Sequence, residues 1–175
     1  IELPDNSVDM SVTSPPYINA VDYARTHKLE YYWLGIADGS VNDLKKEFIG
    51  TEKVYADTYK ELNQTGIEEL DEIIESIYEE DKKRSAVVWK FFEDMRDHFE
   101  EMHRVMEEDG IYVMIVGNNQ IRDHEINNWK YLEEIAKNKG FEVENRFTSG
   151  IINHYIPFDR DEKIDKDYVL VFRNS

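Results

Sequence analysis

Four short apolar runs stand out in an otherwise polar chain, and they predict β-strands. The first, Val8–Thr13, is rich in β-branched and apolar residues and lies between Asp5-Asn6-Ser7 and Pro15-Pro16. Two consecutive prolines remove backbone donors, so the strand has to end before them. The other three runs have the length and composition of buried strands and lie at 111–116, 141–147 and 168–172.

Three longer segments carry apolar residues at helical spacing. The strongest covers 85–107, and a second covers 127–139, where Gly140 can end it. An aromatic-rich segment at 23–35 is also expected to be helical, with Gly35 as its terminator. The apolar stripe of the strongest helix consists of Val88, Phe91, Phe92, Met95, Phe99, Met102, Val105 and Met106.

Between about residues 38 and 84 the composition shifts to charged and polar residues. Ile67, Leu70, Ile73, Ile74 and Ile77 fall at helical spacing there, while the opposite face carries Glu and Asp. The pattern predicts an acidic helical insertion over a more regular core. We expect it to serve packing or partner contacts, because its negative charge opposes phosphate binding; target recognition is the alternative.

Strands and helices alternate along the chain, which is typical of an α/β fold. Long helices between buried strands imply a mostly parallel sheet covered on both faces. A length of 175 residues suits one domain, so we expect residues 1–175 to form a single domain that carries the insertion. Ligands of such sheets bind beyond the carboxyl ends of the strands, and the loop 14–17 lies at that edge.

The formal net charge of −17 opposes a nucleic-acid partner, because phosphate contacts need Lys and Arg. The acidic residues are unevenly placed, however, and a basic surface could lie elsewhere in the polypeptide. The absence of cysteine excludes disulfides and thiolate zinc sites and suits a reducing cytoplasm. The five histidines show no paired ligand spacing, so no metal is expected. The apolar runs are too short for a membrane span.

The loop after the first strand, Ser14-Pro15-Pro16-Tyr17, carries the sharpest chemical signal. The amino group of a nucleic-acid base is a poor nucleophile, because its lone pair is delocalised into the ring. Acceptors placed where its N–H bonds point as the nitrogen becomes pyramidal stabilise the transition state. The Ser14 hydroxyl and the Pro15 carbonyl can be these acceptors, and the Tyr17 ring can stack on an everted base. A proline-rich loop or polyproline ligand is the alternative interpretation.

The segment from Thr13 to Tyr17, with Ser7-Val8-Asp9 ahead of it, resembles the catalytic motif of the DNA amino-methyltransferases, in which Ser, Asn or Asp precedes Pro-Pro-Tyr. The resemblance implies a partial Rossmann-like methyltransferase fold with an antiparallel C-terminal strand. It also implies direct methyl transfer from S-adenosylmethionine to an exocyclic amino group in DNA. Ser at the first motif position accompanies cytosine N4 more often than adenine N6 in this family. Further similar segments are 19–25, 33–35, 104–110 and 168–173.

The chain also departs from this family. The glycine-rich loop that usually holds the methionine part of the cofactor is missing, and so is the acidic residue that binds the ribose hydroxyls. We therefore expect a catalytic half that needs a cofactor-binding half, either in the same polypeptide or in another chain. The chain by itself should bind S-adenosylmethionine weakly or not at all.

Beyond the motif, we assign Asn19, Tyr23 and Arg25 to substrate contact, and Thr13 and Asn118 to the cofactor edge of the sheet. Each assignment has a structural alternative. Tyr23 can be a core aromatic residue, Arg25 can belong with His27 and Lys28 to a solvated helix face, and Asn118 can form a simple turn.

Three functions compete. The leading one is a DNA amino-methyltransferase of restriction-modification or solitary type. An RNA enzyme, for example one acting on guanine N2 of transfer RNA, would use a related loop, although no RNA-binding module is visible. The third is a non-catalytic interaction fragment whose acidic helices bind a protein partner.

Overall fold

The computed structural model describes residues 1–18, 22–36, 40–150 and 166–175. The chain forms two compact units, of which the first holds Ile1–Pro15 and Met95–Ser175 and the second holds Pro16–Asp94. The sequence predicts one domain with an insertion at about 38–84. The second unit extends beyond this predicted insertion at both ends, and it begins inside the Ser14-Pro15-Pro16-Tyr17 loop. None of the described helices is long and apolar enough to cross a membrane.

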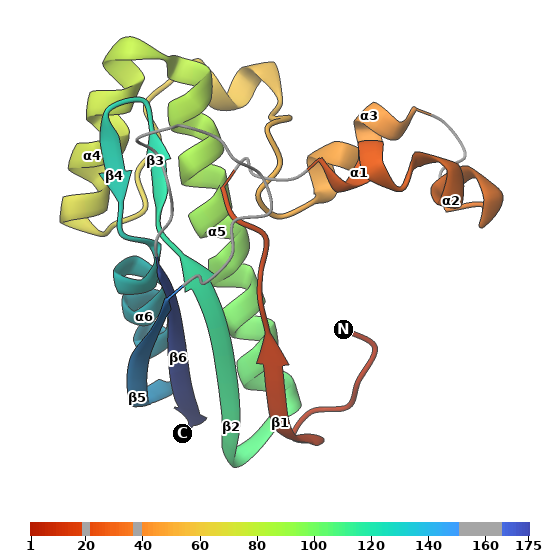
Figure 1. Ribbon diagram of the computed structural model, residues 1–175, viewed down its shortest axis with the longest axis vertical. Coiled ribbons are helices and arrows are strands. Elements are labelled where there is room, and N and C mark those ends of the chain that lie inside the picture. The colour runs from red at the N-terminus through yellow and green to blue at the C-terminus, as the bar shows by residue number, and fades with distance from the viewer. Residues whose placement is uncertain (19–21, 37–39, 151–165) are drawn as a thin grey trace. The chain divides into compact units, whose positions relative to one another are not determined.

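A four-stranded sheet with the order β1-β2-β6-β5 forms the first unit (Figure 1). β1 (Val8–Thr13) runs parallel to β2 (Met106–Gly117), so the carboxyl ends of both strands meet at one edge. β6 (Lys166–Asn174) is antiparallel both to β2 and to β5 (Phe141–Gly150). The predicted α/β class and the antiparallel C-terminal strand are therefore present. The parallel share of the sheet is smaller than expected, because β5 and β6 follow each other in the chain and pair antiparallel.

One face of the sheet packs on the second half of α5 (Lys82–Val105) through aromatic rings. Phe99 is fully buried and meets Tyr112, Phe141 and Phe172 edge-on, with ring centroids 6.0, 5.9 and 5.8 Å apart. Such pairs add about 0.5–1.5 kcal/mol each beyond the area they bury. The predicted stripe from Val88 to Val105 is buried, which confirms the helical pattern, but the helix ends before Met106, which begins β2 and is buried there.

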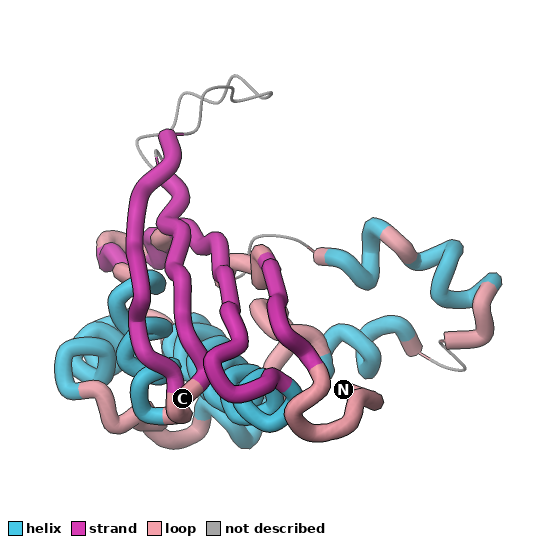
Figure 2. The backbone as a smooth tube through the Cα atoms, turned by 90° about the horizontal axis from the view of Figure 1, so that it is seen from below, coloured by secondary structure: helices cyan, strands magenta, loops and turns pink. Residues whose placement is uncertain are grey.

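α6 (Asn128–Asn138) packs on the same face and buries Tyr131, Leu132 and Ile135. Its Trp129 stacks on Tyr168 of β6 with ring centroids 5.3 Å apart. Figure 2 shows the helices of this unit on one side of the strands. A short hairpin of β3 (Asn119–Ile121) and β4 (His124–Ile126) precedes α6. The sequence pattern did not predict this hairpin, since strands of three residues leave no periodic signal.

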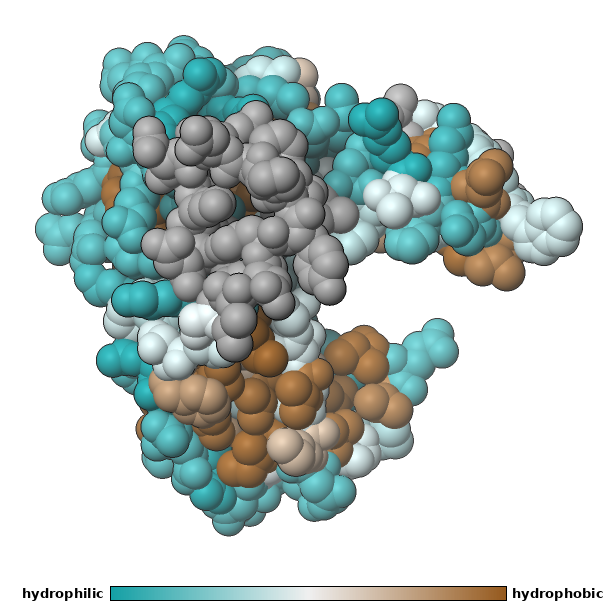
Figure 3. Space-filling model, in the orientation of Figure 1, coloured by the Kyte–Doolittle hydropathy of each residue, from teal (hydrophilic) through white to brown (hydrophobic). Residues whose placement is uncertain are grey.

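The opposite face of the sheet is apolar and open to solvent among the described residues. Met10 and Val12 of β1 are 60% and 59% exposed, and Phe147 of β5 is 51% exposed. The residues of β2 and β6 beside them, which include Ile111, Val113, Ile115 and Val171, are only half-buried. Figure 3 shows this hydrophobic patch over the strands. Monomeric proteins rarely leave such a surface uncovered.

The second unit is mostly helical. The predicted helix at 23–35 forms as two short helices, α1 (Tyr23–Thr26) and α2 (Lys28–Trp33), with Gly35 at a positive φ of 68° after them. The insertion predicted to be helical contains α4 (Glu68–Glu80), which buries Leu70, Ile74 and Ile77 as its pattern predicts. The remaining elements are α3 (Val41–Leu44) and the 3₁₀ turns η1 (Lys45–Glu47) and η2 (Ala56–Tyr59).

Side-chain hydrogen bonds fix α4 within this unit. The carboxylate of Asp71 accepts hydrogen bonds from the backbone N–H groups of Thr65 and Gly66, at 2.6 and 3.0 Å, just ahead of the helix. The Ser85 hydroxyl, at the start of α5, donates to the carbonyl of Ile74 at 2.8 Å. These bonds satisfy groups at the helix terminus and between the two helices that would otherwise lack partners.

Candidate active site

Ser14 directly follows β1 at the edge where the carboxyl ends of β1 and β2 meet. Thr13, the last residue of β1, is half-buried and lies opposite Met114 of β2. Ser14 is exposed, and its hydroxyl makes no hydrogen bond to the described part of the chain. Pro15 is buried, so the loop is anchored on one side while the serine faces solvent. A hydroxyl in this position is available to a ligand.

Tyr17 lies beyond the two prolines, at the start of the second unit. The residue is neither fully buried nor fully exposed, and Ile18 after it is 2% exposed. The buried isoleucine anchors the loop here, while part of Tyr17 stays accessible. A tyrosine sunk in the core could not stack on a base, so its partial accessibility is compatible with the predicted role.

Gly50 supports the loop from a distant part of the sequence. A β-carbon at this position would lie 2.7 Å from the carbonyl oxygen of Tyr17 and 3.3 Å from the β-carbon of Pro16. Its φ of +76° also disfavours a larger residue. Sequence reasoning missed Gly50, because an isolated glycine in a polar segment gives no sign of what lies against it.

Asp22 organises the helix that follows the motif. Its Oδ1 accepts a hydrogen bond of 3.0 Å from the backbone N–H of Arg25, and its Oδ2 pairs with the ammonium group of Lys45. Burial acts to raise the pKa of Asp22, but the hydrogen bonds from Lys45 and Arg25 outweigh it and lower the pKa of this carboxyl. The ionised carboxylate thus links α1 to η1, three residues before Gly50. Neither Asp22 nor Lys45 was predicted as part of the site.

The predicted substrate residues are placed as follows. Asn19 lies outside the described residues. Tyr23 begins α1 and is 37% exposed, which argues against a role in core packing. Arg25 is exposed on the same helix. By contrast, Tyr31 stacks on Phe48 with ring centroids 6.1 Å apart and has a packing role.

Asn118 lies at the sheet edge that Ser14 also occupies, immediately after β2. Its Nδ2 donates to Oδ1 of Asn127 at 2.8 Å, and Asn128 donates in turn to the carbonyl of Gly117 and to Asn119. These asparagines join the end of β2 to the start of α6. The Oδ1 of Asn118 is buried and has no hydrogen-bond partner in the described part of the protein. An unused buried acceptor is costly, which makes it a candidate ligand contact.

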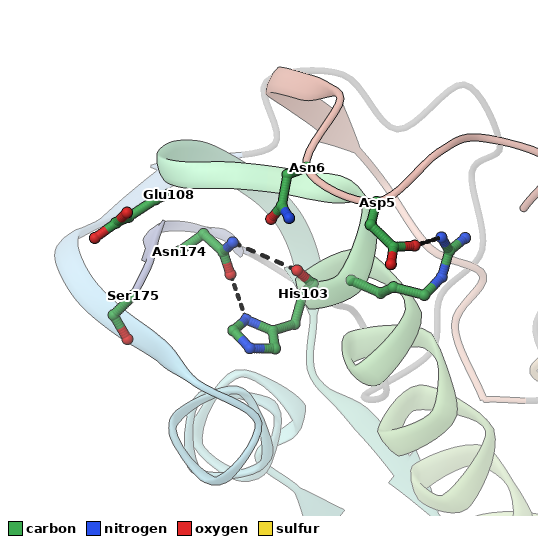
Figure 4. A pocket seen from close by; sticks show the side chains of 7 residues that line it. Asp5, Asn6, His103, Glu108, Asn174 and Ser175 are labelled. Carbon is green, nitrogen blue, oxygen red and sulfur yellow. Dashed lines mark hydrogen bonds and ion pairs between the residues drawn. The ribbon is translucent and has the colours of Figure 1, made fainter.

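A separate cavity of about 390 Å³ lies at the other end of the sheet, near the start of β1 (Figure 4). Its polar groups bind each other: the Nδ1 of His103 donates to Oδ1 of Asn174 at 2.5 Å, and Arg104 pairs with Asp5. The Nδ2 of Asn174 donates to the backbone carbonyls of Met106 and Glu107, both at 3.1 Å. This arrangement fastens the end of β6 to the end of α5, so its role is structural.

Two findings bear on metals and titration. No cluster of three or more His, Cys, Asp or Glu side chains that could hold a metal occurs among the described residues. His98 lies between α5 and the sheet, with its Nε2 2.5 Å from the hydroxyl of Tyr112. Burial lowers the pKa of His98 and raises that of Tyr112, so both groups are neutral near pH 7.

Comparison with known proteins gives one sequence relative and several distant structural ones. No family model matches the chain. A 42-residue segment, 24% of this chain and 8% of the relative, is 43% identical to the type II methyltransferase M.BsoBI of Geobacillus stearothermophilus. A proposed DNA modification methylase of Thermus thermophilus, TTHA0409, aligns over 99% of this chain with 17% identity and a TM-score of 0.49. Its complex with S-adenosyl-L-methionine aligns with 14% identity and the same TM-score.

The chain spans about half the length of the TTHA0409 structures, 47% and 48% in these two comparisons. The sequence likeness to a type II methyltransferase extends over 42 residues, 24% of this chain.

Proposed function

We propose that the chain supplies the catalytic loop of an S-adenosylmethionine-dependent enzyme that methylates an exocyclic amino group of a base in DNA, most readily cytosine N4. One observation carries the proposal: the Ser14 hydroxyl is exposed, lacks a partner in the described part of the chain, and sits at the carboxyl edge of two parallel strands. This is the edge at which α/β sheets bind ligands.

The reaction requires the protein mainly to position the base and its amino group. The base swings out of the duplex and stacks on Tyr17, which recovers part of the unstacking cost of a few kcal/mol. Its amino N–H groups donate to the Ser14 hydroxyl and the Pro15 carbonyl, so the lone pair turns out of the ring as the nitrogen becomes pyramidal. Bound S-adenosylmethionine supplies an activated methyl group. The amino nitrogen would attack the methyl carbon, the bond between sulfur and methyl would break to leave S-adenosylhomocysteine, and the surplus amino proton would pass to solvent beside the Ser14 hydroxyl, without a covalent bond to the protein.

Two residues at the sheet edge are our candidates for cofactor contact. Thr13 is half-buried at the end of β1, and Asn118 offers the unused Oδ1 acceptor described above. A cofactor amino or hydroxyl group would satisfy that acceptor. Their roles are proposals, since the glycine-rich loop expected to hold the rest of the cofactor does not occur in this sequence.

The cofactor-binding half, we propose, covers the open face of the sheet. Met10, Val12 and Phe147 expose an apolar surface there, and β1 pairs only with β2 within the described residues, so its other edge can accept a further strand. Calorimetry checks this: the isolated chain should bind S-adenosylmethionine weakly or not at all. Tight binding by the isolated chain would contradict the proposal.

Identification of the methylated nucleoside shows which base is the target. The native protein is incubated with labelled S-adenosylmethionine and either duplex DNA or total RNA, and the methylated nucleoside is identified by mass spectrometry. We expect N4-methylcytosine from DNA. N6-methyladenine would correct the base, methylated guanine in RNA would replace the substrate class, and no transfer to either polymer would favour a non-catalytic fragment. We also propose a cytoplasmic location, with which the lack of cysteine agrees.

A further inference from the structure

A basic cavity lies in the second unit, a few residues beyond the catalytic loop. It has a volume of about 270 Å³ and is lined by Arg25, Lys28, Tyr32, Ser40, Val41 and Lys45. The wall formed by Lys45 is fixed, because its ammonium group pairs with Asp22 and its side chain is only 15% exposed. Three cationic residues therefore line one small cavity in a chain whose net charge is −17.

Two of these cations make no ion pair with the residues that the structure describes. Several lysines and arginines of the described ranges pair with carboxylates, as Lys90 does with Asp94 and Arg173 with Glu144. The guanidinium of Arg25 and the ammonium of Lys28 make no ion pair or side-chain hydrogen bond within the described ranges. In a protein with such an excess of acid, two unpaired cations beside one cavity indicate a site for an anion from outside the chain.

The helix beside the cavity exposes apolar and aromatic side chains. α2 buries none of its residues; Leu29 is 82% exposed and Trp33, one helical turn later, is 90% exposed. Ile36 follows at 54% exposure, and apolar residues of this segment are visible at the surface in Figure 3. A tryptophan placed outside the core next to unpaired cations is the combination with which proteins bind a nucleic-acid strand, since phosphates need charge and bases need a flat surface.

We propose that Arg25 and Lys28 hold a backbone phosphate of DNA in this cavity, and that Trp33 stacks on a base left unpaired when the target base leaves the duplex. The proposal rests on the DNA substrate proposed above and adds where the strand is held. This surface would supply the basic contacts that the acidic remainder of the chain lacks.

The length of chain between Tyr17 and Arg25 limits how far the bound phosphate can lie from the everted base. Arg25 follows Tyr17 by eight residues, which span at most about 29 Å when fully extended. One DNA strand rises about 3.4 Å per nucleotide, so the phosphate lies within about eight nucleotides of the everted base. The contact is therefore close to the target, within one turn of the duplex.

The salt dependence of DNA binding tests the proposal. Dissociation constants of the native protein for a target duplex are measured over a range of salt concentrations for wild type, the double variant Arg25→Gln/Lys28→Gln, and the control Lys60→Gln/Lys137→Gln. The control removes the same charge from exposed lysines elsewhere. Loss of one phosphate contact should weaken binding and make the slope of log K against log salt less negative by about 0.9 in the first variant only.

Tryptophan fluorescence tests the stacking part. DNA should quench the emission of wild type, and Trp33→Phe should lose most of that quenching, whereas Trp89→Phe should keep it because Trp89 is half-buried and bonded to Gln64. If the two double variants bind DNA with equal affinity and equal salt slope, the inference about Arg25 and Lys28 is wrong, but the proposed methyltransferase activity is not affected. Failure of the wild type to bind DNA, or binding of RNA alone, would overturn it together with the DNA substrate. DNA binding that depends on Arg25 without any methyl transfer would support it and refute the proposed activity.

Discussion

Gly50 lies so close to Tyr17 that a β-carbon on the glycine would be 2.7 Å from the tyrosine carbonyl oxygen. The two residues are 33 positions apart in the sequence, and their contact fixes the far side of the diproline loop. The structure of the proposed catalytic loop thus depends on a residue without chemical function of its own.

Gly50→Ala should therefore reduce methyl transfer more than it reduces stability. The new methyl group has to displace the Tyr17 backbone, and a displacement of about 1 Å in a catalytic group costs about 100-fold in rate. Gly66→Ala is the matched control: φ is +83° there, but nothing lies within 4 Å of the added carbon. Transfer rates and denaturant midpoints of both variants separate the two effects. Equal losses of activity in both would show that backbone strain, and not contact with Tyr17, matters.

Ser14→Ala should lower kcat for methyl transfer by roughly 10²–10³-fold, the usual cost of losing one group that stabilises a transition state. The change should leave stability unaltered, because the hydroxyl is exposed and has no partner in the described part of the chain. Ser76→Ala, on the solvent side of α4, serves as the control. A Ser14→Ala enzyme with wild-type kcat would refute the proposed role of the hydroxyl.

Two substitutions of Tyr17 distinguish stacking by its ring from hydrogen bonding by its hydroxyl. Tyr17→Phe keeps the aromatic plane and should retain most of the activity, whereas Tyr17→Ala should raise KM for DNA, since stacking of a base on an aromatic ring contributes about 1–3 kcal/mol. Steady-state kinetics with the target duplex measure both. If the phenylalanine variant is as impaired as the alanine variant, the phenolic hydroxyl is the important group.

Much of the architecture could be predicted from the sequence, because local patterns determine it. The stripe containing Phe99 and Met95 predicted α5 to within three residues at its start, and the apolar run at 111–116 predicted the centre of β2. The diproline loop was found for the same reason, since Pro15 and Pro16 end a strand wherever they occur.

The remaining features depend on contacts between distant residues, which no local pattern encodes. Gly50 matters only because Tyr17 folds against it, and Lys45 only because Asp22 lies 23 positions earlier. Pairing of β6 with β2, which makes the sheet less parallel than expected, joins residues 50 or more positions apart. The division of the chain between Pro15 and Pro16 likewise follows from packing and leaves no mark in composition.

The contact between His98 and Tyr112 predicts how stability depends on pH. Burial lowers the pKa of His98 in the folded state, while the unfolded chain takes up the proton near pH 6.5. A group with a lowered folded pKa stabilises the protein above the unfolded pKa, and this contribution is lost as the pH falls. The free energy of unfolding should therefore decrease from pH 8 to pH 5. His98→Gln should show a weaker decrease in denaturant titrations. A wild-type profile in His98→Gln would contradict this assignment.

Asn174 should be a strong determinant of stability although it lies far from the proposed catalytic loop. Its buried amide donates to the carbonyls of Met106 and Glu107 and accepts from His103, so three groups at the α5–β2 junction depend on it. Asn174→Ala should lower the free energy of unfolding by about 1–3 kcal/mol, the cost of leaving buried groups unpaired. Asn138→Ala, at the exposed end of α6, should cost much less.

Asn174→Asp tests which bonds matter, since it keeps an acceptor for His103 but places a carboxylate against backbone carbonyls. We expect it to be at least as destabilising as alanine in urea denaturation. A stable aspartate variant would mean that the bond to His103 alone holds the end of β6 in place.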